Sequence, residues 1–138
     1  MSRDVAMLKF FLFCGALLGG LGVAAGSFGA HGLKQLLDAT GRADNWETAV
    51  RYCLYHGLAL VSIAVAAGMP QAGPAAQSLL KAAGWCFLVG TAIFSGCLAA
   101  LALSGVRILG AIVPIGGVLF LAGWALVAAA AVSFEPPR

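Results

Sequence analysis

Charged residues are scarce in this chain, and their scarcity excludes an ordinary soluble domain. Only 9% of the 138 residues are charged, whereas 62% are hydrophobic. A soluble domain carries roughly a quarter charged residues to cover its surface. We therefore expect lipid to surround most of this chain, and its length supports one domain over residues 1–138.

Clustered basic residues and clustered metal ligands are also missing. The eight Lys and Arg residues stand singly along the chain, so nucleic acid is not an expected partner. The four cysteines lie far apart, each inside an apolar stretch: Cys14, Cys53, Cys86 and Cys97. Such positions predict free thiols that fill apolar space, with no disulfide and no bound metal.

Recognisable reaction sites are missing as well. The sequence shows no Ser-His-acid set, no pair of buried carboxylates and no phosphate-binding loop after a strand. We therefore assign no catalytic residue, expect no cofactor and do not expect an enzyme.

Four long apolar runs are what the sequence does contain. About 20 helical residues cross the roughly 30 Å of hydrocarbon in a bilayer, and each run is long enough. None alternates as the strands of a membrane barrel would. The first run follows Arg3 and Lys9, an order that superficially resembles a signal peptide, but we interpret it as a span. The sequence predicts an all-α integral membrane bundle of four transmembrane helices, at about 8–30, 46–69, 82–103 and 108–132.

The connection between the first two spans is the longest. Three leucines within it share one helical face: Leu33, Leu36 and Leu37. They predict a short helix in the membrane interface, which Gly41 should end. Asp44 and Glu47 resemble an acidic capping box at the start of the second span, and Trp46 stands where an interfacial anchor belongs.

The positive charges divide evenly between the two sides of the predicted topology. One side carries Lys34, Arg42, Arg51 and Arg107, and the other carries Arg3, Lys9, Lys81 and Arg138. The positive-inside rule then has little to act on. Four spans put both termini on the same side, which we expect to be cytoplasmic.

Small residues recur at helical spacing in the first and third spans. The first span has a stripe formed by Gly15, Gly19, Gly22 and Gly26, and the third has Ala92, Gly96 and Ala100. Such stripes predict close helix packing. Pro114 in the fourth span predicts a kink or local unwinding, so a broken helix that lines a cavity is the alternative.

Polar residues collect at the start of the second span and at the end of the first. Glu47 and Arg51 are four residues apart in the order that favours an ion pair. We expect an interfacial cluster of His31, Lys34, Glu47, Arg51, Tyr52 and Tyr55.

His56 lies deeper in the second span than this cluster. At its estimated depth the other spans contribute a polar layer with it: Ser95, Pro114, Gly116 and Gly117. A neutral His56 bonded to Ser95, or to a carbonyl freed near Pro114, explains the layer structurally. A small-molecule or head-group pocket and proton transfer are two other interpretations. A haem held by His31 and His56 would need both histidines at similar depth, which the spans do not offer.

Several motifs resemble the domain-of-unknown-function 423 family, which includes small membrane proteins like transmembrane protein 256. They are GSFGAHGLK at 26–34, Tyr52 with HGLAL at 56–60, FSG at 94–96, PIGG at 114–117, then Phe120 and GW at 123–124. The resemblance implies a four-helix protein of bacterial or mitochondrial-type inner membranes. It implies no known activity, cofactor or catalytic residue.

Two hypotheses for function follow. The first is a non-enzymatic protein of a bacterial cytoplasmic membrane that works through helix packing, as a homo-oligomer or an accessory subunit of a larger membrane complex. The second is a small transporter or channel with a polar site around His56. Membrane lipid is a partner in both.

Overall fold

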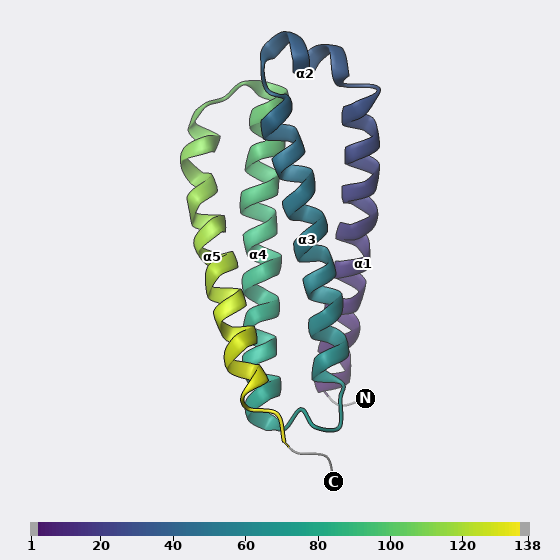
Figure 1. The fold of residues 1–138 in the computed structure, drawn as a ribbon, viewed down its shortest axis with the longest axis vertical. Helices are drawn as coiled ribbons and strands as arrows, with labels where there is room; N and C mark the ends of the chain where they lie inside the picture. The colour runs from purple at the N-terminus through teal and green to yellow at the C-terminus, as the bar shows by residue number, and fades with distance from the viewer. Residues whose placement is uncertain (1–2, 136–138) are drawn as a thin grey trace.

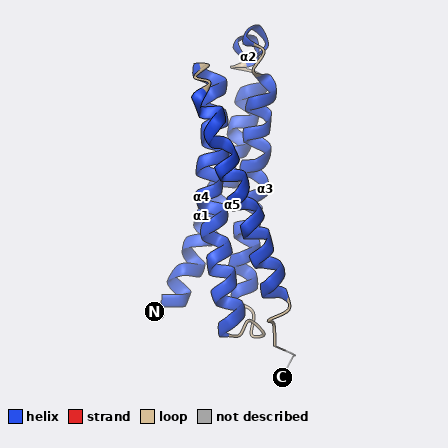
Figure 2. Cartoon of the chain, turned by 90° about the vertical axis from the view of Figure 1, so that its left-hand side faces the viewer, coloured by secondary structure: helices blue, strands red, loops and turns tan. Residues whose placement is uncertain are grey.

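The chain folds into helices joined by short loops. A computed structural model describes residues 3–135, and within them it contains no strand (Figure 2). The helices are α1 (Arg3–Ala30), α2 (Lys34–Thr40), α3 (Ala43–Ala67), α4 (Pro74–Ser104) and α5 (Ile108–Ala131). All except α2 are long and apolar enough to cross a membrane. The predicted fold class is confirmed; residues 1–2 and 136–138 of the predicted domain lie outside the described residues.

The helices stand in the spatial order α1, α3, α4, α5 (Figure 1). α3 and α4 form the central pair, α1 packs on α3, and α5 packs on α4. α1 begins and α5 ends at the same end of the bundle, and α2 covers the opposite end (Figure 1). Because α1 and α5 are outer helices, most of their surface faces outward.

α4 starts well before the predicted residue 82. Its first residue is Pro74, whose fixed φ and missing N–H suit the first turn of a helix. Ala75 and Ala76 follow, and alanine is the strongest helix former. Local propensity therefore extends the helix beyond the apolar run.

The predicted capping box at the start of α3 is wrong. α3 begins at Ala43, its N-cap residue is Arg42, and no side chain caps it. Asp44 instead lies in the first turn, where its negative charge stabilises the positive end of the helix dipole. Gly41, in contrast, ends α2 with φ 63° as predicted, because the left-handed conformation favours glycine.

Trp46, the predicted interfacial anchor, is buried between helices. Only 8% of its surface is exposed, and its indole Nε1 donates to the Ala25 carbonyl of α1 over 3.0 Å. Gly29 leaves room for this ring, since a Cβ there would collide with it. Trp46 therefore ties α3 to α1.

Glycines bring two pairs of helices into backbone contact. A Cβ on Gly15 would lie 2.7 Å from the carbonyl oxygen of Gly57, where α1 crosses α3. A Cβ on Gly116 would lie 2.9 Å from the carbonyl oxygen of Gly90, where α5 crosses α4. Neither crossing has room for a side chain, and such approach is how helices gain van der Waals contact in lipid.

Only part of the predicted glycine stripe on α1 packs against another helix. A Cβ on Gly22 would meet the Leu54 side chain at 2.7 Å, and one on Gly26 would meet Val50 at 3.3 Å. Gly19 has open space where its side chain would be. The stripe packs on α3 at three of its four glycines.

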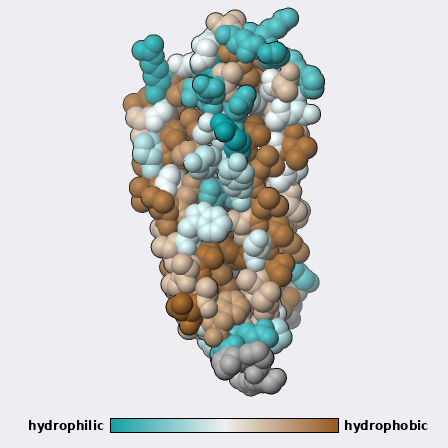
Figure 3. All heavy atoms as spheres, in the orientation of Figure 1, coloured by the Kyte–Doolittle hydropathy of each residue, from teal (hydrophilic) through white to brown (hydrophobic). Residues whose placement is uncertain are grey.

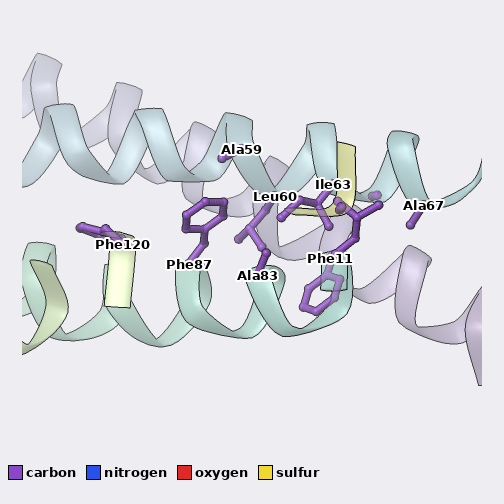
Figure 4. Packing of buried hydrophobic residues seen from close by; sticks show 11 residues of the cluster. Phe11, Ala59, Leu60, Ile63, Ala67, Ala83, Phe87 and Phe120 are labelled. Atoms are coloured by element: carbon purple, nitrogen blue, oxygen red, sulfur yellow. The ribbon is translucent and has the colours of Figure 1, made fainter. Parts of the chain in front are cut away.

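Larger apolar side chains fill the remaining space between the helices. Phe11, Leu60 and Phe87 are fully buried and come from α1, α3 and α4 (Figure 4). Phe11 fits against Gly84, where a Cβ would touch its ring. This contact joins α1 to α4 near the end of the bundle where α1 begins.

We predict that Gly15→Ala lowers stability by about 1–3 kcal/mol, because its methyl group would overlap the Gly57 carbonyl. Gly19→Ala is the matched control on the same stripe. It meets open space, and the higher helix propensity of alanine should leave stability equal or raised. Thermal unfolding in detergent measures both. Equal melting temperatures for the two variants would contradict the assigned crossing.

Candidate functional site

His56 lies in the interior with both ring nitrogens bonded. Only 4% of its surface is exposed. Its Nε2 accepts a hydrogen bond from the indole Nε1 of Trp124 over 3.3 Å. The ring proton therefore lies on Nδ1, which donates to the Tyr52 carbonyl over 2.9 Å. This is a neutral imidazole whose hydrogen-bonding capacity is fully used.

An aromatic cluster holds the His56 ring in place. The ring stacks on Phe120 with centroids 3.5 Å apart and planes 6° apart. Tyr52 stacks on Phe94 with centroids 4.5 Å apart. Phe87 lies 5.2 Å from the histidine ring. Side chains from α3, α4 and α5 thus meet at one buried ring, which fixes its orientation.

A groove of about 700 Å³ opens beside this cluster, between α3 and α5. His56, Pro114 and Gly117 line it, whereas Gly116 is buried against α4. Hydrophilic atoms extend from the α2 end down the middle of one face, between hydrophobic flanks (Figure 3). The predicted layer therefore forms in part, around an imidazole that is already satisfied.

The predicted hydrogen-bond partners of His56 are wrong. Ser95 lies at the estimated depth but lines a groove on another side of α4, whereas its neighbour Phe94 lines the His56 groove. Successive helical residues point about 100° apart, so equal depth does not bring side chains together. The carbonyl near Pro114 is not the partner either, because Trp124 and Tyr52 occupy both nitrogens.

α5 continues through Pro114 without interruption, so the predicted unwinding is not present. Pro114 lacks the N–H that would bond the Gly110 carbonyl, a loss of one helical bond. Membrane helices tolerate proline when neighbouring groups and local adjustments satisfy the freed carbonyl. The alternative of a broken helix at this point loses its main support.

A second groove, of about 290 Å³, contains two buried hydroxyls without hydrogen bonds. It lies between α1, α3 and α4, and nearly all of its lining is apolar. Thr91 and Ser95 are 3% and 8% exposed, and neither hydroxyl bonds any described residue. Thr91 is not among the residues predicted from the sequence, although its spacing of four from Ser95 places both on one polar stripe of α4.

The interfacial residues do not form a single cluster. Lys34 pairs with Asp38 of its own helix over 2.8 Å, and this carboxylate raises the pKa of Lys34. The predicted Glu47–Arg51 ion pair is wrong, because Arg51 Nε donates to the Glu47 backbone carbonyl over 3.4 Å. His31 is exposed at the end of α1.

Tyr52 and Tyr55 lie on the other side of α3 from Lys34. Both line the His56 groove, and Tyr52 belongs to the aromatic cluster. Their exposure of 37% and 57% leaves part of each ring facing outward. The tyrosines extend the His56 site toward the α2 end of the bundle.

Metal-binding arrangements are absent from the residues that the structure describes. The four cysteines are free thiols, each half-buried. Cys53 directs its Sγ to the Leu18 carbonyl over 3.4 Å, a contact between α3 and α1. A haem between His31 and His56 does not fit, because His31 is exposed at the helix end and His56 has no free nitrogen.

The chain matches a known protein family. Residues 25–117 match the family described as "Protein of unknown function (DUF423)". The chain belongs to this family. The match covers the end of α1, all of α2, α3 and α4, and the first part of α5 with Pro114.

Bacterial relatives extend the similarity to most of the chain. A UPF0382 membrane protein of Staphylococcus haemolyticus is 45% identical over 117 residues, 85% of this chain and 90% of the relative. One from Staphylococcus epidermidis is 42% identical over 127 residues, 92% of this chain and 98% of the relative. No solved structure matches. The DUF423 chain is thus a member of an uncharacterised family of membrane proteins.

We predict that Trp124→Phe lowers stability by about 1–3 kcal/mol, because it removes the donor to His56 and leaves a buried nitrogen unpaired. Trp85→Phe is the control, since the Trp85 indole makes no hydrogen bond with a described residue and packs on Phe10 and Phe11. Thermal unfolding compares the two variants. A Trp124→Phe protein as stable as the control would show that the bond to His56 contributes nothing.

Proposed function

We propose that this DUF423 protein is non-enzymatic and works through helix packing, as a homo-oligomer in which α4 docks on a second copy. The location that we propose is a bacterial cytoplasmic membrane, since the relatives are bacterial membrane proteins. Both termini would face the cytoplasm.

The main support for docking at α4 is the small size of the outward-facing residues at its centre. The outward-facing stripe at its centre consists of small residues: Ala92, Gly96 and Ala100. A Cβ on Gly96 would meet nothing within 4 Å. The fold of the single chain leaves this small stripe uncovered, between the exposed large side chains of Val89 and Leu103 on the same helix.

The outer helices differ in this respect from the centre of α4, residues 92–100. Many of their exposed residues are large, with Leu17 and Leu21 on α1, and Val118 and Leu121 on α5. Large apolar side chains suit contact with fluid lipid, whereas small ones let a helix backbone approach. The contrast supports a helix partner at α4.

The two unpaired hydroxyls lie beside the small stripe. Thr91 and Ser95 line the same groove as Ala92 and Gly96. A buried hydroxyl without a partner costs free energy, and serine or threonine hydroxyls bond across helices in membranes. Both hydroxyl oxygens are buried in the single chain, so each side chain would rotate about χ1 to reach a carbonyl oxygen of a helix docked on α4.

A second copy of the chain meets the geometric requirement of such docking. Small residues spaced by four mediate close packing of parallel helices. A second copy inserted in the same direction presents the same stripe. The two α4 helices are then parallel and are related by a two-fold axis normal to the membrane. Two-fold dimers are also the commonest assemblies of identical chains.

The transporter hypothesis finds less support at His56. A site that moves protons or holds a ligand needs a ring nitrogen that is free to exchange partners. Trp124 and Tyr52 occupy both nitrogens from within the chain. The geometry therefore supports a packing role for this residue.

We predict that the native chain in mild detergent has the mass of a homo-oligomer and that Gly96→Leu is monomeric, because the new side chain fills the docking face. Gly20→Leu is the matched control: Gly20 also faces open space, but on α1. Light scattering measures mass, and thermal unfolding verifies folding of each variant.

Two outcomes would contradict this docking face. One is a native chain that is monomeric in detergent and in lipid discs. The other is an oligomer that Gly96→Leu and Gly20→Leu weaken equally. A foreign protein at fixed stoichiometry in place of the second copy would favour the accessory-subunit form of the packing hypothesis.

A further inference from the structure

A pocket of about 410 Å³ lies at the α2 end of the bundle, on a side of α3 that faces away from the His56 groove. α1, α2 and α3 form its walls. Its α1 wall is made of small residues, Gly26, Gly29 and Ala30, and Val50 adds an apolar side chain from α3. The part of the wall that α1 contributes is therefore apolar.

Four charged residues line the same pocket. Lys34 and Asp38 come from α2, and Glu47 and Arg51 come from α3. Two positive and two negative side chains make the set neutral overall. Such a set complements a ligand that carries one charge of each sign.

Much of this hydrogen-bonding capacity is unused. Arg51 donates from its Nε to the Glu47 backbone carbonyl. Its two terminal nitrogens and the Glu47 carboxylate have no hydrogen bond to a described residue. Glutamate four residues before arginine would ordinarily favour a pair within the helix. Lys34 and Asp38 bond each other and are both largely exposed, which leaves further donors and acceptors on each.

The position of the pocket matches the boundary between head groups and hydrocarbon. The charged residues lie on α2 and in the first turns of α3, where the spans leave the apolar zone. The apolar wall lies beside these charges, on the last residues of α1. A ligand with a zwitterionic head and an apolar body fits this arrangement.

We propose that this pocket binds a phospholipid with a phosphoethanolamine head group. The phosphate would accept hydrogen bonds from Arg51 and Lys34, and the primary ammonium would donate to Glu47 and Asp38. Free inorganic phosphate matches only half of the set, because the two carboxylates repel it. A choline head group has the same charges but no N–H to donate.

The test is native mass spectrometry of the detergent-purified chain, titrated separately with phosphatidylethanolamine, phosphatidylcholine and phosphatidylglycerol. Phosphatidylethanolamine should bind about tenfold more tightly than either of the others, because only it satisfies all four side chains. Soluble phosphoethanolamine at the same concentration should not displace it. Equal binding of the three lipids, or displacement by the soluble head group, would overturn the proposal.

Variants locate the binding at this pocket. Arg51→Gln should weaken the binding of every phospholipid about tenfold, because it removes a charged donor to the shared phosphate. Glu47→Gln should remove the preference for ethanolamine over choline and leave phosphatidylcholine binding unchanged. Arg107→Gln, an exposed cation at the same end but outside the pocket, is the control. Each variant is checked for unchanged helix content by circular dichroism. Undiminished binding by Arg51→Gln, or a preference for ethanolamine that survives Glu47→Gln, would refute the site.

Discussion

A bilayer interior offers no water to complete a hydrogen bond, and this constraint explains most of the arrangement of the chain. Helices satisfy the backbone within each span. His56 is bonded at both nitrogens by Trp124 and Tyr52, and Trp46 donates to the Ala25 carbonyl. Two buried hydroxyls are exceptions to this pattern of satisfied polar groups. Those of Thr91 and Ser95 have no hydrogen bond to any described residue. This exception is one of the observations behind the proposed docking of a second copy on α4.

Glycine contacts and exposed side chains divide the molecule into internal and external packing. The crossings at Gly15–Gly57 and Gly90–Gly116 hold the two outer helices on the central pair. At these crossings the backbones are as close as they can be. These glycine surfaces are therefore already covered by helices of the same chain. The stripe at Gly96 is also made of small residues, but a Cβ added to Gly96 would have no neighbour within 4 Å. This difference is the basis of the proposed docking of a second copy on α4.

Features that depend on residue type and spacing could be predicted from the sequence. The spans, the short helix ended by Gly41 and the interior position of His56 all follow from apolar length, glycine preference and the cost of polar burial. Features that depend on rotation about a helix axis could not. Depth alone placed Ser95 beside His56, whereas the 100° between successive residues points it to the other groove. The burial of Trp46 could not be predicted either, because the sequence does not identify its partner, a carbonyl on α1.

Cysteine cross-linking in intact membranes tests most directly whether α4 is the docking face. Ala92→Cys is compared with Leu121→Cys, an exposed position on α5, in a chain whose native cysteines are replaced by alanine. A short bismaleimide should join two copies through residue 92 and leave residue 121 unjoined, since parallel α4 helices bring the two cysteines at 92 together. Cross-linking through 121 but not through 92, or through neither, would contradict the account.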